Sequence, residues 1–468
     1  MITTTTSSIN DLPAEVLLQV LEEIASFDAT DGHTLPTSLF ACSQVDRRWH
    51  LIACTPGLYK DIKVPFKALC ERGFNTAYWT QTWLQRSGSH LVNMNVYVQE
   101  DIYQELFQFY ALLESLIPHV SRLRSFSITA SDEVTHDLPL LFHPLKYVDA
   151  PALEEVVLCH ARNSRASERR VIMRSDPVQW SRFFWSSPKL RKVTLLGSIT
   201  ERPLENLTHL EMCNVVLKEH VFRRIATNCP HLEVLKLQRL HIPTPILTDP
   251  RSNDPLPLLS LRSLTLSFDL GVWEDYVDGR HTYILTRIEA PNLEYLEVDV
   301  GKLLVDITNV LPSPSSLMGL RRLSIQNMGS GFFFETDYFD ELSMGRIEEI
   351  ELVNTQPEPL GFDSTASKKQ WAHVKSILID SDDADDLVWL CQALIVRPQI
   401  QRVFLSPRSM KQLKENIAMI DLSDNLIWVG VRGHSGTLGI FESSEEGGHR
   451  LYAEDWLERR TALKVYRR

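Results

Sequence analysis

The chain has 468 residues and a formal net charge of −12 at pH 7, an acidic balance that argues against nucleic-acid binding, which needs a basic face. Its seven cysteines are odd in number and include no CxxC pair, which argues against a disulfide framework and against a structural zinc site. The N-terminus lacks the basic and apolar regions of a signal peptide, and no window approaches the roughly 18 apolar residues of a membrane span, so we expect a protein of the cytoplasm and/or nucleus that binds neither membrane nor nucleic acid.

The stretch DLPAEVLLQVLEEI, residues 11–24, predicts a helix with an unusually wide apolar surface. Pro13 lies in the first turn, where its missing N–H costs nothing, and Asp11 and Glu15 place negative charge at the N-terminal end of the helix dipole. At 100° per residue, the apolar side chains cover an arc of about 200°, whereas a surface helix typically needs about 100°. A single neighbouring helix would leave part of this arc uncovered.

A second helical pattern runs through SLFACSQVDRRWHLIAC, residues 38–54, and ends before Pro56-Gly57. Its apolar residues recur at spacings of three, four and three, which places them on one face of a helix. These residues are Cys42, Val45, Trp49 and Ile52. We expect this face to cover one part of the apolar arc of the first helix.

Together, LPAEVLLQVLEEI, LFACSQVDRRWHLIA and GLYKDI resemble the F-box: a Leu-Pro start, an acidic and apolar first helix, a Val-x-x-x-Trp core helix and a bulky aromatic tail. The resemblance is carried by Leu12, Pro13, Glu15, Val16, Leu17, Ile24, Leu39, Cys42, Val45, Arg48, Trp49, Ile52, Leu58 and Tyr59. It implies a flexible N-terminus over residues 1–8 and an F-box helical domain over residues 9–64 that binds a Skp-family adaptor and, through it, a cullin. The implied adaptor-binding residues are Leu12, Pro13, Val16, Leu17, Leu18, Val20, Leu21, Ile24, Leu39 and Trp49. The alternative is a small helical cap that has no partner.

The rest of the chain repeats the pattern Leu-x-x-Leu-x-Leu, in which Ile, Val, Met or Phe also occurs. Alternate residues of Leu-x-Leu face one side of a short strand, and one such unit cannot bury its apolar face without neighbours. Twelve matches begin at Leu91, Leu123, Leu153, Leu190, Leu207, Leu232, Leu261, Leu293, Leu320, Ile347, Val374 and Ile400. The alternative is chance occurrence in a leucine-rich chain, which the similar intervals and the turn residues before the strands argue against.

The stretch KEHVFRRIATNCPHLEVLKL resembles the cysteine-containing leucine-rich repeat often found downstream of F-boxes, and WTQTWLQRSGSHLVNMNV resembles the entry segment of fungal F-box-like proteins. These resemblances imply an α/β fold class: a small all-α F-box domain followed by an irregular leucine-rich-repeat solenoid, with parallel strands on the concave face and helices and loops outside. We expect a linker or entry segment over residues 65–89, the solenoid with about 12–13 repeats over residues 90–431, and a loop with a C-terminal capping helix over residues 432–468.

The sequence contains no convincing catalytic motif. No P-loop and no HExxH metal motif occurs, and GHSGTLG lacks the last glycine of a nucleophile elbow. The acidic run from Asp380 to Asp386 lacks the glycine and the glutamate of a calcium loop. We therefore expect a protein that is not an enzyme and that needs no cofactor and no metal.

Residues between the inward apolar positions of the repeats are expected to line the concave face. In the C-terminal half these residues are acidic with interspersed arginines, a pattern that favours a target with basic or mixed charge. The candidate target-binding residues are Tyr295, Glu297, Asp299, Arg322, Glu349 and Glu351. The alternative is a solvated sheet face without a ligand.

An F-box followed by leucine-rich repeats resembles the substrate receptors of Skp–cullin–F-box (SCF) ubiquitin ligases. That resemblance implies a chain that holds a target protein near the ligase and contributes proximity rather than catalytic residues. The alternative function is a non-catalytic interaction scaffold that binds an adaptor without ubiquitin transfer.

Overall fold

The structure is a computed structural model, and it describes residues 12–28, 38–71, 73, 75–98, 106–130, 143–145, 147–160, 187–196, 204–213, 219–240, 255–268, 284–300, 311–328, 346–355, 371–381, 402–406, 409, 432–433 and 436–437. The chain divides into two compact units, Met1–Arg202 and Pro203–Arg468. The expected flexible N-terminus (1–8) and the C-terminal capping helix lie outside the described residues.

The first unit begins with three helices that pack on one another. They are α1 (Ala14–Asp28), α2 (Ser38–Ser43) and α3 (Arg47–Ala53), and α1 contacts both of the others. A 3-10 turn, η2 (Pro56–Tyr59), follows and leads directly into the strand β1 (Asp61–Pro65). The sequence predicts a helical domain over residues 9–64, and β1 corrects this expectation at the end of that range.

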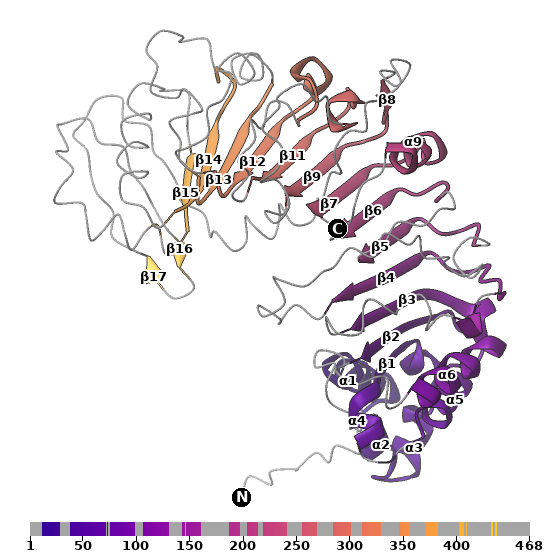
Figure 1. Cartoon of the computed structure of the whole chain (residues 1–468). Coiled ribbons are helices and arrows are strands. Elements are labelled where there is room, and N and C mark those ends of the chain that lie inside the picture. The colour runs from indigo at the N-terminus through magenta and orange to yellow at the C-terminus, as the bar shows by residue number, and fades with distance from the viewer. Residues whose placement is uncertain are drawn as a thin grey trace, which may run out of the picture. The chain divides into compact units, whose positions relative to one another are not determined.

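Within the described residues of the first unit, five strands form a parallel sheet in chain order (Figure 1). The strands after β1 are β2 (Val92–Val98), β3 (Leu123–Ala130), β4 (Glu155–His160) and β5 (Lys192–Leu196). The helices are α4 (Phe66–Glu71), α5 (Thr76–Arg86) and α6 (Leu106–Leu116), with 3-10 turns η4 (Ile117–Arg122) and η6 (His143–Leu145). Residues 65–89, expected as a linker or entry segment, contain the whole of α4 and α5, and Trp83 and Leu84 of α5 are buried.

The second unit contains a parallel sheet in the order β6-β7-β9-β11-β12-β13-β14-β15. These strands are β6 (His209–Cys213), β7 (Val234–Leu240), β9 (Ser263–Phe268), β11 (Tyr295–Asp299), β12 (Arg322–Gln326), β13 (Glu349–Val353), β14 (Ser376–Asp380) and β15 (Arg402–Leu405). Short elements lie between or after them: α9 (Glu219–Asn228), β8 (Leu256–Pro257), η8 (Ile284–Arg287), β10 (Ile288–Glu289), η10 (Pro314–Leu317), β16 (Arg432–Gly433) and β17 (Gly436–Thr437).

Each of the twelve sequence matches ends in one of these parallel strands, so the expectation of parallel strands at these positions is confirmed. In the match that leads into β9, the motif residues Leu261, Leu264 and Leu266 are all fully buried, as expected for the inward apolar positions. The first match differs, because Leu91 is exposed and the buried row of β2 begins at Val92. The core of each unit therefore consists of stacked rows of aliphatic side chains on one face of its sheet.

Candidate functional site

The first helix presents two different apolar faces. Leu17 and Leu21, one turn apart, are 1% and 0% exposed, whereas Val16 and Val20 beside them are each 37% exposed. The helix begins after Pro13, whose carbonyl oxygen accepts hydrogen bonds from the backbone N–H groups of Val16 and Leu17. Within the chain, α2 and α3 thus cover only the Leu17 side of the apolar arc that the sequence predicts.

The second helical pattern is interrupted at Asp46, so the expectation of one continuous helix over residues 38–54 is wrong. Asp46 adopts an extended backbone and caps α3: its Oδ1 accepts hydrogen bonds from the N–H groups of Arg48 (2.7 Å) and Trp49 (2.9 Å). This is the ordinary preference of aspartate for the N-cap position. As a result Val45, expected on the inner face, lies in the turn between α2 and α3 and is 60% exposed.

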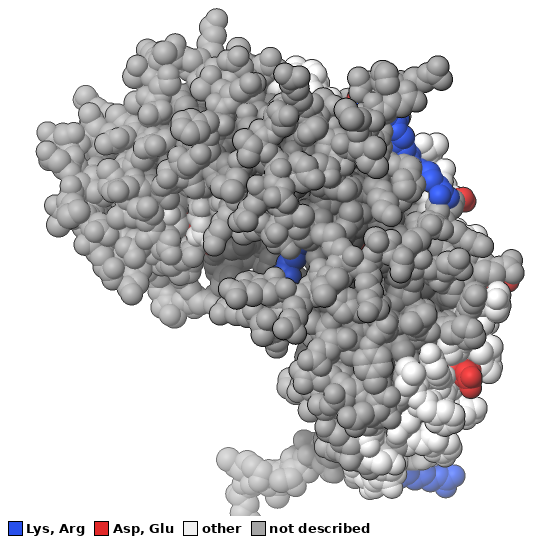
Figure 2. All heavy atoms as spheres, in the orientation of Figure 1, with Lys and Arg blue, Asp and Glu red and all other residues white. Residues whose placement is uncertain are grey.

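Further apolar side chains of the same region are exposed. Phe40 on α2 and Leu51 on α3 are 56% and 65% exposed. We define the exposed apolar set as Val16, Val20, Phe40, Val45 and Leu51. In the face drawn in Figure 2, the described surface over the N-terminal helical part is mostly uncharged. Exposed apolar surface of this kind marks a candidate protein-interaction site.

Two contacts hold the small helical region together. The guanidinium group of Arg48 donates a hydrogen bond to the carbonyl oxygen of Leu12, just before α1. Tyr59 is buried, donates its hydroxyl to the carbonyl oxygen of Ala53 (2.7 Å), and meets the Trp83 ring of α5 edge-on at 5.2 Å between centroids. Burial raises the pKa of the Tyr59 phenol, and the nearby Arg86 partly opposes this effect.

The ten residues predicted to bind an adaptor fall into three groups of exposure. Leu17, Leu21, Leu39 and Trp49 are buried, Leu12, Leu18 and Ile24 are half-buried, and Pro13, Val16 and Val20 are exposed. The four buried residues hold the helices together. Phe40, Val45 and Leu51 were not predicted as surface residues, and the capping aspartate in QVDRRW was the signal that could have identified the turn at Val45.

The sheet-face residues predicted in the second unit lie on three adjacent strands, β11, β12 and β13. Glu297, Ser324 and Glu351 are the fifth residues of the matches that begin at Leu293, Leu320 and Ile347, and Glu297 pairs in register with Ser324, and Ser324 with Glu351. The sequence therefore predicted the register of this row correctly. Tyr295, Glu297 and Glu351 are nevertheless buried, and Asp299, Arg322 and Glu349 are half-buried.

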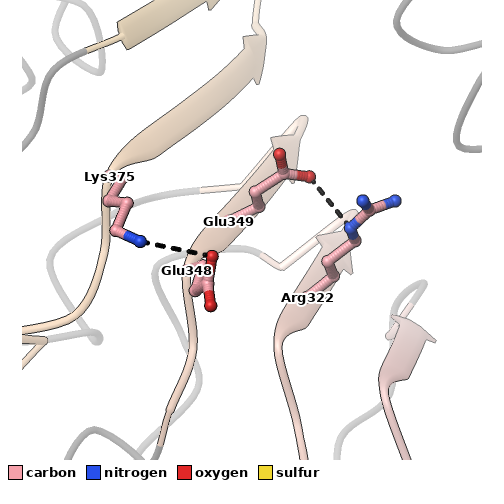
Figure 3. A network of polar contacts seen from close by, with 4 residues as sticks. All are labelled: Arg322, Glu348, Glu349 and Lys375. Atoms are coloured by element: carbon pink, nitrogen blue, oxygen red, sulfur yellow. Dashed lines mark hydrogen bonds and ion pairs between the residues drawn. The ribbon is translucent and has the colours of Figure 1, made fainter.

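Polar contacts within the sheet occupy several of these side chains. Glu297 accepts hydrogen bonds from Gln326 (2.6 Å), from the Tyr295 hydroxyl (3.0 Å) and from Thr265 (3.2 Å). Figure 3 shows two ion pairs near the beginning of β12, β13 and β14: Arg322 with Glu349 at 3.1 Å, and Lys375 with Glu348 at 3.5 Å. The contacts of Glu297, Arg322 and Glu349 occupy charged groups of the predicted face, and they leave fewer polar groups for a ligand than the sequence suggests.

A family model described as F-box-like matches residues 9–64. No curated protein matches the chain. Among the described residues, no helix is both long and apolar enough to cross a membrane, and no three metal-binding side chains gather at one point. F-box domains generally bind Skp-family adaptors, and the family match identifies residues 9–64, which include α1 to α3 and the exposed apolar set, as an F-box-like domain.

Proposed function

We propose that this chain is the substrate-recognition subunit of an SCF-type E3 ubiquitin ligase. Its F-box-like domain binds a Skp-family adaptor and, through the adaptor, a cullin. The following part is a leucine-rich-repeat solenoid that holds a target protein. The chain itself contributes no catalytic residue, and it acts in the cytoplasm and/or nucleus. The observation that carries this proposal is the exposed apolar set on the F-box-like domain.

The exposed apolar set supports adaptor binding because its members are costly to leave in water. Fully burying one aliphatic or aromatic side chain contributes roughly 1.5–3 kcal/mol, so a partner that covers several of them gains a substantial part of its binding energy there. The five side chains come from α1, α2, α3 and the turn between the last two. A small domain that places apolar residues outward on all of its helices is better suited to docking a partner than to capping a sheet.

The leucine-rich-repeat assignment is supported by the regular relation between motif and strand. In the second unit, for example, Leu264, Leu296 and Leu323 occupy equivalent motif positions, pair in register on neighbouring parallel strands, and are all buried. Repeats that stack in this way present long rows of side chains on one face, which suits the binding of an extended protein surface.

The proposal is tested by co-expressing the full chain with a Skp-family adaptor and a cullin, followed by size-exclusion chromatography. A ternary complex is expected. The double variant Val16→Asp/Val20→Asp should lose the adaptor while remaining folded, because both side chains are on the surface. Gln19→Asp is the control for the single variant Val16→Asp, since each adds one negative charge at an exposed position of α1 and Gln19 lies outside the apolar set.

The same experiment also distinguishes the ubiquitin-ligase subunit from a second candidate function. The same apolar set would serve an interaction scaffold that binds an adaptor without ubiquitin transfer. Adaptor binding without cullin recruitment would favour the scaffold. A chain that binds no adaptor at all would overturn both functions.

A further inference from the structure

The sheet of the first unit has one covered face and one partly open face. Alternate residues of β2, from Val92 to Val98, are buried, and the residues between them are half-buried. The helices α4 and α5 contact β2 and β1 respectively, and Phe66 of α4 meets Phe109 of α6 edge-on at 5.4 Å. In β9 and β11 of the second unit, by contrast, residues on both faces are almost all buried. The half-buried face of β1 to β4 therefore offers a more accessible polar surface than the row that the sequence singled out.

A recess of about 410 Å³ opens on this polar face. Its lining includes Asp61, Asn93, Arg124, Ser125, Glu154 and Glu155. Four of these residues form one row across four strands, since Asp61 pairs with Asn93, Asn93 with Ser125, and Ser125 with Glu155. At about 4.8 Å per strand the row spans roughly 14 Å, the length of about four residues of an extended chain.

Hydrogen bonds within the recess orient its polar groups. The Asn93 amide donates to Asp61, and the Arg124 Nε donates to the Asn93 oxygen at 3.0 Å. The Ser125 hydroxyl donates to one oxygen of Glu155 at 3.4 Å. A positioned carboxylate is thus presented at each end of the row, with the guanidinium group of Arg124 between them.

The charges of the recess are unequal at its two ends. Glu154 and Glu155 place two carboxylates at the β4 end, and Asp61 places one at the β1 end. Lys63 follows Asp61 on the same face of β1, and Arg124 occupies the middle. At the β4 end, Lys192 of β5 is the register partner of Glu155. A ligand with one cationic side chain is therefore favoured beside Glu154 and Glu155. A ligand with several neighbouring cations would be repelled by Lys63, Arg124 and Lys192.

We propose that the polar face of β1 to β4 binds an extended segment of a target protein that carries a single arginine or lysine, with its cation against Glu154 and Glu155. Asn93 and Asn95, which both line the recess, and Arg124 hydrogen-bond the backbone of this segment. The inference rests on the proposed target-binding role of the chain, and it names the class of target segment. It does not depend on adaptor or cullin binding.

The test uses the full chain, purified with a Skp-family adaptor where the two associate, as bait for an mRNA-displayed library of random 12-residue peptides. Enriched peptides are expected to carry one basic residue at a constant position, without a basic run. The best peptide is then labelled and titrated by fluorescence anisotropy against wild type, Glu154→Gln/Glu155→Gln and the control Glu114→Gln. Glu114 is an exposed carboxylate of α6, in the same unit but outside the recess.

Loss of affinity of about tenfold in the double variant, with Glu114→Gln unchanged, supports the proposal, and binding should also weaken between 0.1 and 0.5 M salt. The proposal is overturned if no peptide is enriched, if enriched peptides lack the single basic residue, or if the double variant binds as well as wild type. Circular dichroism of each variant confirms that the fold is retained. Adaptor binding is measured separately on the same proteins, so a failure of the F-box function is distinguished from a failure of peptide recognition.

Discussion

Val16 and Leu17 are consecutive residues of α1 that lie in opposite environments: 37% of Val16 is exposed, and only 1% of Leu17. The same substitution to aspartate should therefore have two different effects. Leu17→Asp buries an unpaired carboxylate and should lower the stability of the F-box-like domain by about 3–5 kcal/mol. Val16→Asp should leave the fold intact and weaken adaptor binding by at least about tenfold.

Thermal unfolding and adaptor pull-down on the two variants separate these effects. The distinction matters because Leu17→Asp should abolish adaptor binding by unfolding the domain, whether or not Leu17 contacts the adaptor. If Val16→Asp bound the adaptor like wild type, the exposed side of α1 would not be the docking surface.

Asp46 provides a test of how the F-box-like domain is assembled. Asp46→Ala removes the acceptor for two backbone N–H groups at the start of α3 and should cost about 1 kcal/mol of stability. Asp46→Asn should cost much less, because asparagine is an equally good N-cap residue. Chemical denaturation of both variants measures the difference. Equal losses would mean that the charge of Asp46, rather than its capping bonds, is what stabilises α3.

The periodic parts of the fold were predictable from the sequence, and the interruptions were harder to predict. The alternation in β2 was predictable, because strand alternation is a local property, and Met94 and Val96 of the first match are buried while the residues that alternate with them are half-buried. The apolar pattern from Cys42 to Ile52 fits one continuous helix as well as it fits two short helices. The hydrogen bonds by which Asp46 caps α3 show that the chain forms two. The strand β1 was missed because DIKVP is short and its pairing partner, β2, is about 30 residues away in the sequence.

The candidate sites were predictable in register but not in exposure. The sequence places Glu297 and Glu351 in one row, and the pairing of β11, β12 and β13 confirms this. Their burial depends on what packs on that face, and a strand pattern carries no such information. The row from Asp61 to Glu155 could not be predicted as a site either, since its recess arises only when four strands separated by loops and helices are aligned.

Gly319 is a position where the absence of a side chain is required. A Cβ atom at Gly319 would lie 2.5 Å from the carbonyl oxygen of Pro291 and 3.2 Å from that of Leu293, and backbone atoms cannot easily move away. Gly319→Ala should therefore destabilise the second unit by about 1–3 kcal/mol through overpacking. Gly57→Ala is the control, since a Cβ atom at Gly57 would meet no other atom within 4 Å. Denaturant unfolding with equal midpoints for the two variants would contradict this expectation.

Ionisation of the buried Tyr59 should lower the stability of the protein at alkaline pH. Burial raises the pKa of its phenol above the ordinary value of 10.0, so the native state favours the neutral form more strongly than the unfolded chain does. The stabilisation from Tyr59 is therefore fully present below pH 10 and is lost as the pH rises toward the folded-state pKa. We expect the melting temperature to fall more steeply above pH 10 in wild type than in Tyr59→Phe, which cannot ionise. The phenylalanine variant also loses the hydrogen bond to Ala53, so it should start from a lower melting temperature at pH 8. Parallel slopes for the two proteins between pH 8 and pH 11 would show that ionisation of Tyr59 does not contribute.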